Sequence, residues 1–247
     1  MPPLRAMLAG ALAGLVDLAL PAVCAGCSEP GHLLCPACRR SLAGPARTAW
    51  PNPAPVGLPH PWAVAAYDGA VRSAIVAHKE HGRLSLAGPL GDALARSALA
   101  AAGRLVEPDG RPVLLVPAPS RRRAVRARGH DPTLRLARRA ATGLRRRGVP
   151  MSVLPALRVA EGVMDQSGLG AGERRENLAG SLWVPARLTP LVAGRTVVVV
   201  DDVVTTGATL ADATRALRCA GARVHAVATV AATSRRTAGV SPGARGD

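Results

Sequence analysis

The sequence predicts an α/β protein built on a mostly parallel sheet flanked by helices. Three observations support this fold class. Strand-like and helix-like segments alternate from Trp62 onward. Residues 196–200 are apolar on both faces of a strand, which is typical of a central parallel strand. The chain has 247 residues, of which 48% are hydrophobic, so it is long enough for one or two domains with a substantial core.

The individual elements follow from local patterns in chain order. Strands are expected at residues 63–67, 113–116, 152–157, 196–200 and 224–230. Helices are expected at residues 70–79, 86–102, 131–147 and 207–219. Asp131 suits the N-cap of the third helix, with Pro132 in its first turn. Gly221 suits the end of the fourth.

The chain is expected to contain four parts. Residues 1–44 hold an N-terminal amphipathic helix and a cysteine knuckle, and residues 45–61 form an extended proline-rich connector. Residues 62–233 form the α/β domain, and residues 234–247 are expected to be a mobile tail. The apolar run before residue 21 is interrupted by Asp17 and is too short to span a bilayer, although a signal sequence remains the alternative to a helix.

Composition restricts the classes of partner. The net charge is +16, from 32 basic and 16 acidic residues, and Lys79 is the only lysine among the basic ones. Such a charge fits an anionic partner such as nucleic acid, a phosphorylated metabolite or a membrane surface, but compositional drift toward arginine explains it equally well. Only 2% of residues are aromatic, which argues against a broad stacking surface for nucleic acid.

The cysteines predict a structural metal site. Cys24 and Cys27 form one CxxC pair, and Cys35 and Cys38 form a second. Four thiolates at this spacing can hold Zn²⁺ tetrahedrally, which leaves no open position for catalysis. Free or disulfide-bonded cysteines are the alternative, and the pattern favours a reducing, cytoplasmic compartment. Cys219 is expected to be a core residue.

Residues 197–209 carry the clearest chemistry. An apolar strand is expected to present Asp201 and Asp202 at its exposed carboxyl end, where open α/β sheets bind ligands. A tight loop then opens a helix, so that backbone amides and hydroxyls can hold a phosphate. The residues of this loop are Thr205, Thr206, Gly207, Ala208 and Thr209. The two carboxylates can accept hydrogen bonds from vicinal hydroxyls, as on a ribose. An ordinary acidic strand–turn–helix is the alternative.

All thirteen positions of this segment resemble the signature by which type I phosphoribosyltransferases bind phosphoribosyl pyrophosphate (PRPP). Other motifs precede it in order, and together the set resembles the ComF family of competence protein F-like proteins over residues 12–231. The motifs are residues 15–21, the two CxxC pairs, residues 67–82, residues 116–129, residues 166–169 and residues 174–178. His130, Asp131 and Pro132 depart from the aromatic, Asn and Gln usual in that family, and Val163 stands where it often has Thr.

The resemblance implies a type I phosphoribosyltransferase-like fold with PRPP and Mg²⁺ as ligands. Asp201 and Asp202 would hold the ribose hydroxyls, while Mg²⁺ would bridge ribose and pyrophosphate oxygens. Ser120 and Arg121 lie in a loop that would face pyrophosphate, or else form a solvated basic loop. Arg174 and Arg175 lie in a glycine-rich segment, either a hood over the substrate or a plain exposed loop. Lys79 is either a phosphate or partner contact or a solvated surface residue.

Two functions are consistent with these features. The first is an enzyme that transfers phosphoribose to a nitrogen base with release of pyrophosphate, although no general base is evident. The second is a non-catalytic competence factor that binds single-stranded DNA through arginines, works with other competence proteins in DNA uptake, and keeps PRPP as a regulatory ligand. The acceptor base and the oligomeric state are not predicted by the sequence.

Overall fold

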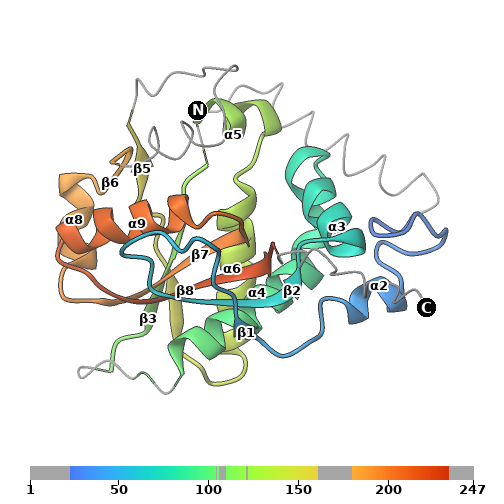
Figure 1. Ribbon diagram of the computed structural model, residues 1–247, viewed down its shortest axis with the longest axis horizontal. Coiled ribbons are helices and arrows are strands. Elements are labelled where there is room, and N and C mark those ends of the chain that lie inside the picture. The colour runs from blue at the N-terminus through green and yellow to red at the C-terminus, as the bar shows by residue number, and fades with distance from the viewer. Residues whose placement is uncertain (1–22, 104, 106–109, 121, 161–179, 234–247) are drawn as a thin grey trace, which may run out of the picture.

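The computed structural model describes residues 23–103, 105, 110–120, 122–160 and 180–233, and within them a six-stranded sheet forms the centre of the molecule (Figure 1). All neighbouring strands are parallel except the first pair, which is antiparallel. In spatial order the strands are β1 (Arg47–Thr48), β2 (His60–Ala66), β8 (Arg223–Ala232), β7 (Thr196–Val204), β3 (Val113–Pro117) and β4 (Met151–Val153). The predicted α/β fold with a mostly parallel sheet is therefore confirmed.

Helices cover both faces of this sheet. The helices α4 (Ala87–Ala102) and α6 (Pro132–Arg145) pack on one face, and α9 (Ala208–Cys219) packs on the other (Figure 1). The strand β7 lies between the two helical layers, and its side chains point alternately to one layer and to the other. Val198 and Val200 belong to one core, whereas Val197 and Val199 belong to the other. The apolar run on both faces thus predicted the central position of this strand.

Shorter elements complete the fold. The helix α3 (Gly69–Glu80) follows β2, and a second, two-stranded sheet is formed by β5 (Arg158–Val159) and β6 (Leu182–Trp183). The remaining helical segments are α2 (Pro36–Arg40), α5 (Arg122–Arg128), α8 (Thr189–Val192) and the 3₁₀ turns η1 (Leu84–Leu86) and η2 (Ala186–Leu188). Asp131 caps α6 as predicted, since its Oδ1 accepts from the N–H of Leu134 at 3.1 Å.

The observed strands differ in length from the predicted ones: 63–67 becomes His60–Ala66, 113–116 becomes Val113–Pro117 and 224–230 becomes Arg223–Ala232. The strand expected at residues 152–157 ends at Val153. The strand expected to end at residue 200 continues to Val204, because β8 runs beside it as far as Ala232 and keeps pairing with it. Asp201 and Asp202 therefore lie inside β7 and not beyond its end, which changes their exposure.

The cysteine-containing segment is attached to the main core. Cys24, Cys35 and Cys38 are buried in the same hydrophobic cluster as Val71 and Ile75 of α3. The helix expected before residue 21 and the tail expected after residue 233 lie outside the described residues. None of the helices described in the structure is long and apolar enough to cross a membrane.

Candidate functional site

The carboxyl ends of the parallel strands meet at one edge of the sheet, and a cavity of about 340 Å³ opens there. It lies between α3 and the end of β7. Its polar lining combines three carboxylates, one ammonium, a phenol and two threonines, supplied by Asp201, Asp202, Glu80, Lys79, Tyr67, Thr205 and Thr209. A smaller hollow of about 30 Å³ lies directly against the loop at residues 205–209. Sequence reasoning predicted most of these residues, and the fold brings them together.

Asp202 is buried, with 5% of its surface exposed, so the expectation of an exposed strand end was wrong. Its Oδ2 lies 2.6 Å from Nζ of Lys79. Burial acts to lower the pKa of Lys79, but the neighbouring Asp202 carboxylate outweighs it and raises the pKa above its ordinary value. Lys79 is thus held as a cation inside the cavity, and it is not a freely solvated surface residue.

Asp201 has a different environment on the same strand. Its Oδ1 accepts from the N–H of Asp202 at 2.8 Å and from Oγ1 of Thr133 at 3.4 Å. Burial and the negative charge of Asp202 raise the pKa of the Asp201 carboxyl well above its usual value, while Lys79 acts in the opposite direction. The Asp201 carboxyl is therefore costly to ionise, whereas the Asp202 carboxylate is the one that pairs with the Lys79 ammonium.

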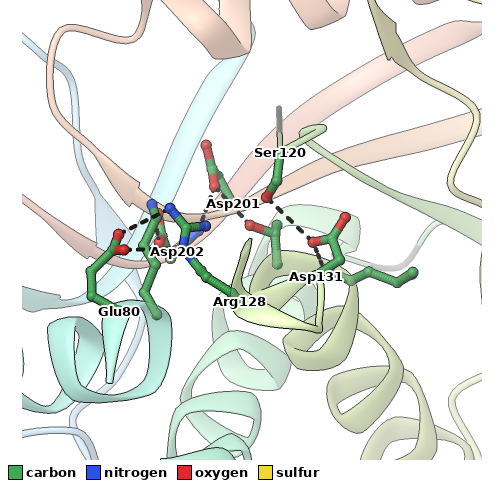
Figure 2. A network of polar contacts seen from close by, with 9 residues as sticks. Glu80, Ser120, Arg128, Asp131, Asp201 and Asp202 are labelled. Carbon is green, nitrogen blue, oxygen red and sulfur yellow. Dashed lines mark hydrogen bonds and ion pairs between the residues drawn. The ribbon is translucent and has the colours of Figure 1, made fainter. Parts of the chain in front are cut away.

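Hydrogen bonds connect this pair to α3 through Lys79 and to α6 through Thr133, and further polar contacts lie around them (Figure 2). Arg128 donates from Nε and Nη2 to the two carboxylate oxygens of Glu80, at 3.0 and 3.2 Å. Ser120 Oγ donates to Oδ1 of Asp131 at 3.4 Å. No local pattern in the sequence pointed to Glu80 or Thr133, because their contacts depend on helices from elsewhere in the chain.

The loop after β7 is shaped by Gly207. This residue has φ +75° and precedes the first turn of α9. A Cβ added here would lie 3.1 Å from Leu58 Cδ2 and from Pro51 Cγ, and 3.2 Å from Pro55 Cγ. Glycine is required both by the left-handed backbone and by the close approach of the proline-rich connector. The connector therefore supports the loop that was predicted to bind phosphate.

Ser120 follows β3 at the same edge of the sheet. It borders a second cavity of about 580 Å³, together with Arg126, Asp131 and Arg158. This placement is compatible with the predicted pyrophosphate side of the site. Arg121, Arg174 and Arg175, which were predicted to add positive charge there, lie outside the described residues, as does Val163.

The four cysteines of the CxxC pairs form a cluster that suits a metal ion. Their Sγ atoms all lie within 4.8 Å of one another. Burial acts to raise the pKa of Cys24, but N–H donors led by that of Cys35 lower it to about 6. A Cβ added to Gly26 would lie only 2.7 Å from Cys38 Sγ, so the chain folds tightly around the sulfurs. This donor set fits a structural Zn²⁺.

Cys219 was expected in the core, but it is exposed. The buried face of α9 is formed by Leu210, Ala213 and Leu217. Cys219 comes two residues after Leu217, which turns it about 200° away from that face at 3.6 residues per turn.

Two comparisons with known proteins agree with this geometry. The family model described as "Phosphoribosyl transferase domain" matches residues 133–241. An orotate phosphoribosyltransferase from Nocardioides sp. (strain ATCC BAA-499 / JS614) is 55% identical over 53 residues, which cover 22% of this chain and 28% of that protein. The chain therefore contains a phosphoribosyl transferase domain, which includes β7, α9 and the loop between them. The match to the curated relative spans less than a third of that relative's length.

Proposed function

We propose that the protein binds PRPP and transfers its phosphoribosyl group to a nitrogen base with release of pyrophosphate. The observation that carries the proposal is the cavity in which the acidic pair, Asp201 and Asp202, adjoins the loop of residues 205–209. A carboxylate pair suits ribose hydroxyls, and a loop opening a helix suits the 5-phosphate.

Each part of the ligand has a matching part of the site in this proposal. The amides and hydroxyls of Thr205, Thr206 and Thr209 hold the phosphate, and the acidic pair orients the ribose. Ser120 lies on the pyrophosphate side. The attacking nitrogen forms a bond to C1 of the ribose while the bond from C1 to the pyrophosphate oxygen breaks. Bound Mg²⁺ supplies positive charge to the pyrophosphate, and Zn²⁺ on the four cysteines has a structural role only.

Calorimetry with PRPP and Mg²⁺ tests binding, and a pyrophosphate-release assay over a panel of nitrogen bases tests transfer. We expect binding that also raises the melting temperature of the protein. Absence of any binding would overturn the proposal, whereas binding without pyrophosphate release on any base would leave PRPP as a regulatory ligand.

A second candidate function is binding of single-stranded DNA in a cytoplasmic competence pathway, with competence proteins as partners. The net charge of +16 favours it, and so does a small cluster of aromatic rings. The ring of His60 lies 5.6 Å from that of Trp50 and 5.2 Å from that of Trp62, measured between centroids. Trp50 is 48% exposed, so its ring is open to a base.

Filter binding in rising salt separates this function from the first. Phosphate contacts predict weak sequence preference and affinity that falls steeply with salt. Salt-insensitive or sequence-selective binding would contradict the charge argument. Trp50→Ala tests the aromatic cluster, with Trp183→Ala, at an equally exposed tryptophan, as the matched control.

A further inference from the structure

The helix α3 brings a fixed positive charge to the acidic pair. Lys79 lies in its last turn, and the ammonium reaches Oδ2 of Asp202 at 2.6 Å (Figure 2 shows Asp202 within its network). The residue after it, Glu80, is held by two hydrogen bonds from Arg128. The end of α3 is therefore anchored on both sides, which fixes the position of the ammonium.

The contacts leave specific carboxylate oxygens for a ligand. Among the described residues, the hydrogen bonds and the ion pair use Oδ1 of Asp201 and Oδ2 of Asp202. One oxygen of each carboxyl remains for the hydroxyls of a ribose. A divalent cation bridging both carboxyls would have to sit beside the Lys79 ammonium, with which it shares a positive sign.

We propose that Lys79 is the resident cation of the acidic pair. Its ammonium takes the place on Asp202 that a divalent cation would otherwise take, so that the pair meets ribose hydroxyls directly and does not hold a free divalent cation. This inference rests on the proposed function, because it assigns the pair to ribose.

The environment of Lys79 supports a specific role for an ammonium. Every other basic residue in the chain is arginine, yet a lysine stands here. A compact ammonium can occupy the position of a metal ion against one carboxylate oxygen, whereas a planar guanidinium spreads its charge over a larger fork. Tyr67, Ile75 and Val76 line the same cavity as the Lys79 side chain that delivers this charge.

A purely structural ion pair and a resident cation predict different results when the charge is removed. Without its ammonium, a structural pair merely loses stability. Loss of a resident cation leaves two adjacent carboxyl groups without a cation beside them, and such a pair can bind a divalent cation through its oxygen atoms. Gain of a metal site is therefore the distinguishing result.

The first experiment titrates Mn²⁺ into the zinc-loaded full chain and follows free Mn²⁺ by electron paramagnetic resonance, with no PRPP present. We expect Lys79→Met to bind one Mn²⁺ at least tenfold more tightly than the wild type. Adding Asp202→Asn to Lys79→Met should abolish that site. Arg72→Met is the matched control, because Arg72 is an exposed cation on the same helix. It should behave as the wild type.

Three results would overturn the proposal. They are equal Mn²⁺ affinity in wild type and Lys79→Met, a gained site that survives Asp202→Asn, and the same gain in Arg72→Met. If Lys79→Met does not fold, Lys79→Gln carries the test, since it removes the charge but keeps a hydrogen-bond donor for Asp202. A melting curve of each variant shows whether it folds, and the test uses a variant that does.

The second experiment uses ribose 5-phosphate, which lacks pyrophosphate and so has no strong chelating group of its own. In buffer freed of divalent cations, we expect the wild type to bind it, Lys79→Met to bind it at least tenfold more weakly, and Mn²⁺ to restore binding to that variant. If the wild type binds neither ribose 5-phosphate nor PRPP, the proposed function fails. The Mn²⁺ titration still decides the role of Lys79.

Discussion

Lys79 and Asp202 are separated by 123 positions in the chain, yet their side chains form a 2.6 Å ion pair at the carboxyl edge of the sheet. One partner ends a helix and the other lies inside the central strand. Because the carboxylate is almost fully buried, removing either partner would leave an uncompensated charge at the proposed ligand site.

Replacing Asp202 with asparagine should destabilise the protein and weaken PRPP binding. The substitution leaves the Lys79 ammonium without its counter-charge in a half-buried place, which we expect to cost about 2 kcal/mol of unfolding free energy. Denaturant melts measure this cost. The control is Asp92→Asn, whose carboxylate pairs with Arg139 at the surface and should change stability by less than about 1 kcal/mol. Equal losses of unfolding free energy in the two variants would show that breaking the Lys79–Asp202 pair costs no more than breaking a surface ion pair.

Replacing Asp201 with asparagine should act in the opposite direction on stability. Burial and the charge of Asp202 raise the pKa of Asp201, so the folded protein binds this proton more tightly than the unfolded chain does. Ionisation of Asp201 therefore costs stability as pH rises above the usual aspartate pKa, and the penalty is largest above the raised value.

The Asp201→Asn protein is expected to be more stable than the wild type at pH 8, with the difference shrinking as the pH is lowered toward 4. Asparagine can still accept the hydrogen bonds from Thr133 and from the Asp202 N–H. PRPP binding should be weaker at every pH. Unfolding curves across this range measure the trend, and a variant that is less stable at pH 8 than at pH 4 relative to wild type would contradict it.

Thr206→Val should weaken PRPP binding without unfolding the protein. The side chain is exposed, so the loss of its hydroxyl leaves the core intact. A hydrogen bond to a charged phosphate contributes about 1.5–3 kcal/mol, which corresponds to a roughly 10- to 150-fold loss of affinity. Calorimetry measures this loss. The control is Thr142→Val, on α6, which should bind PRPP as the wild type does. An unchanged affinity in Thr206→Val would show that Thr206 does not bind the phosphate.

Gly207→Ala should lower stability, whereas the same substitution at Gly143 should raise it. At Gly207 the φ of +75° and the approach of Pro51 and Leu58 to 3.1 Å both oppose a side chain, for a cost of about 1–3 kcal/mol. Gly143 lies within α6 and has no atom within 4 Å of an added Cβ. Alanine there should add about 0.5–1 kcal/mol. If both substitutions shifted the melting temperature in the same direction, this explanation would be wrong.

The protein as purified should hold about one Zn²⁺ per chain, bound by the four clustered cysteines. Cys35→Ser should lose most of this metal and much of its stability, because the cluster belongs to the main hydrophobic core. Gly26→Ala should also lower the zinc content, since its Cβ would meet Cys38 Sγ. Elemental analysis measures the metal. Cys219→Ser is the matched control and should retain it, whereas equal, negligible zinc in all four proteins would exclude the site.

The local sequence determined the elements and much of the candidate site. Apolar runs predicted the strands, and the double-sided run before Asp201 predicted that β7 is central, because only a strand covered on both faces buries every side chain. The loop at residues 205–209 and the two CxxC pairs were also visible, since each is formed by residues close together in the chain.

Only the tertiary structure decided how these parts meet. Asp202 is buried and not exposed because β8 continues beside β7 beyond the apolar run. Lys79 faces Asp202 because α3 packs near the edge of the sheet. Gly207 has to be glycine partly because prolines some 150 positions earlier lie against it. Such contacts depend on the packing of distant segments, and packing is a property of the whole chain that no local pattern encodes.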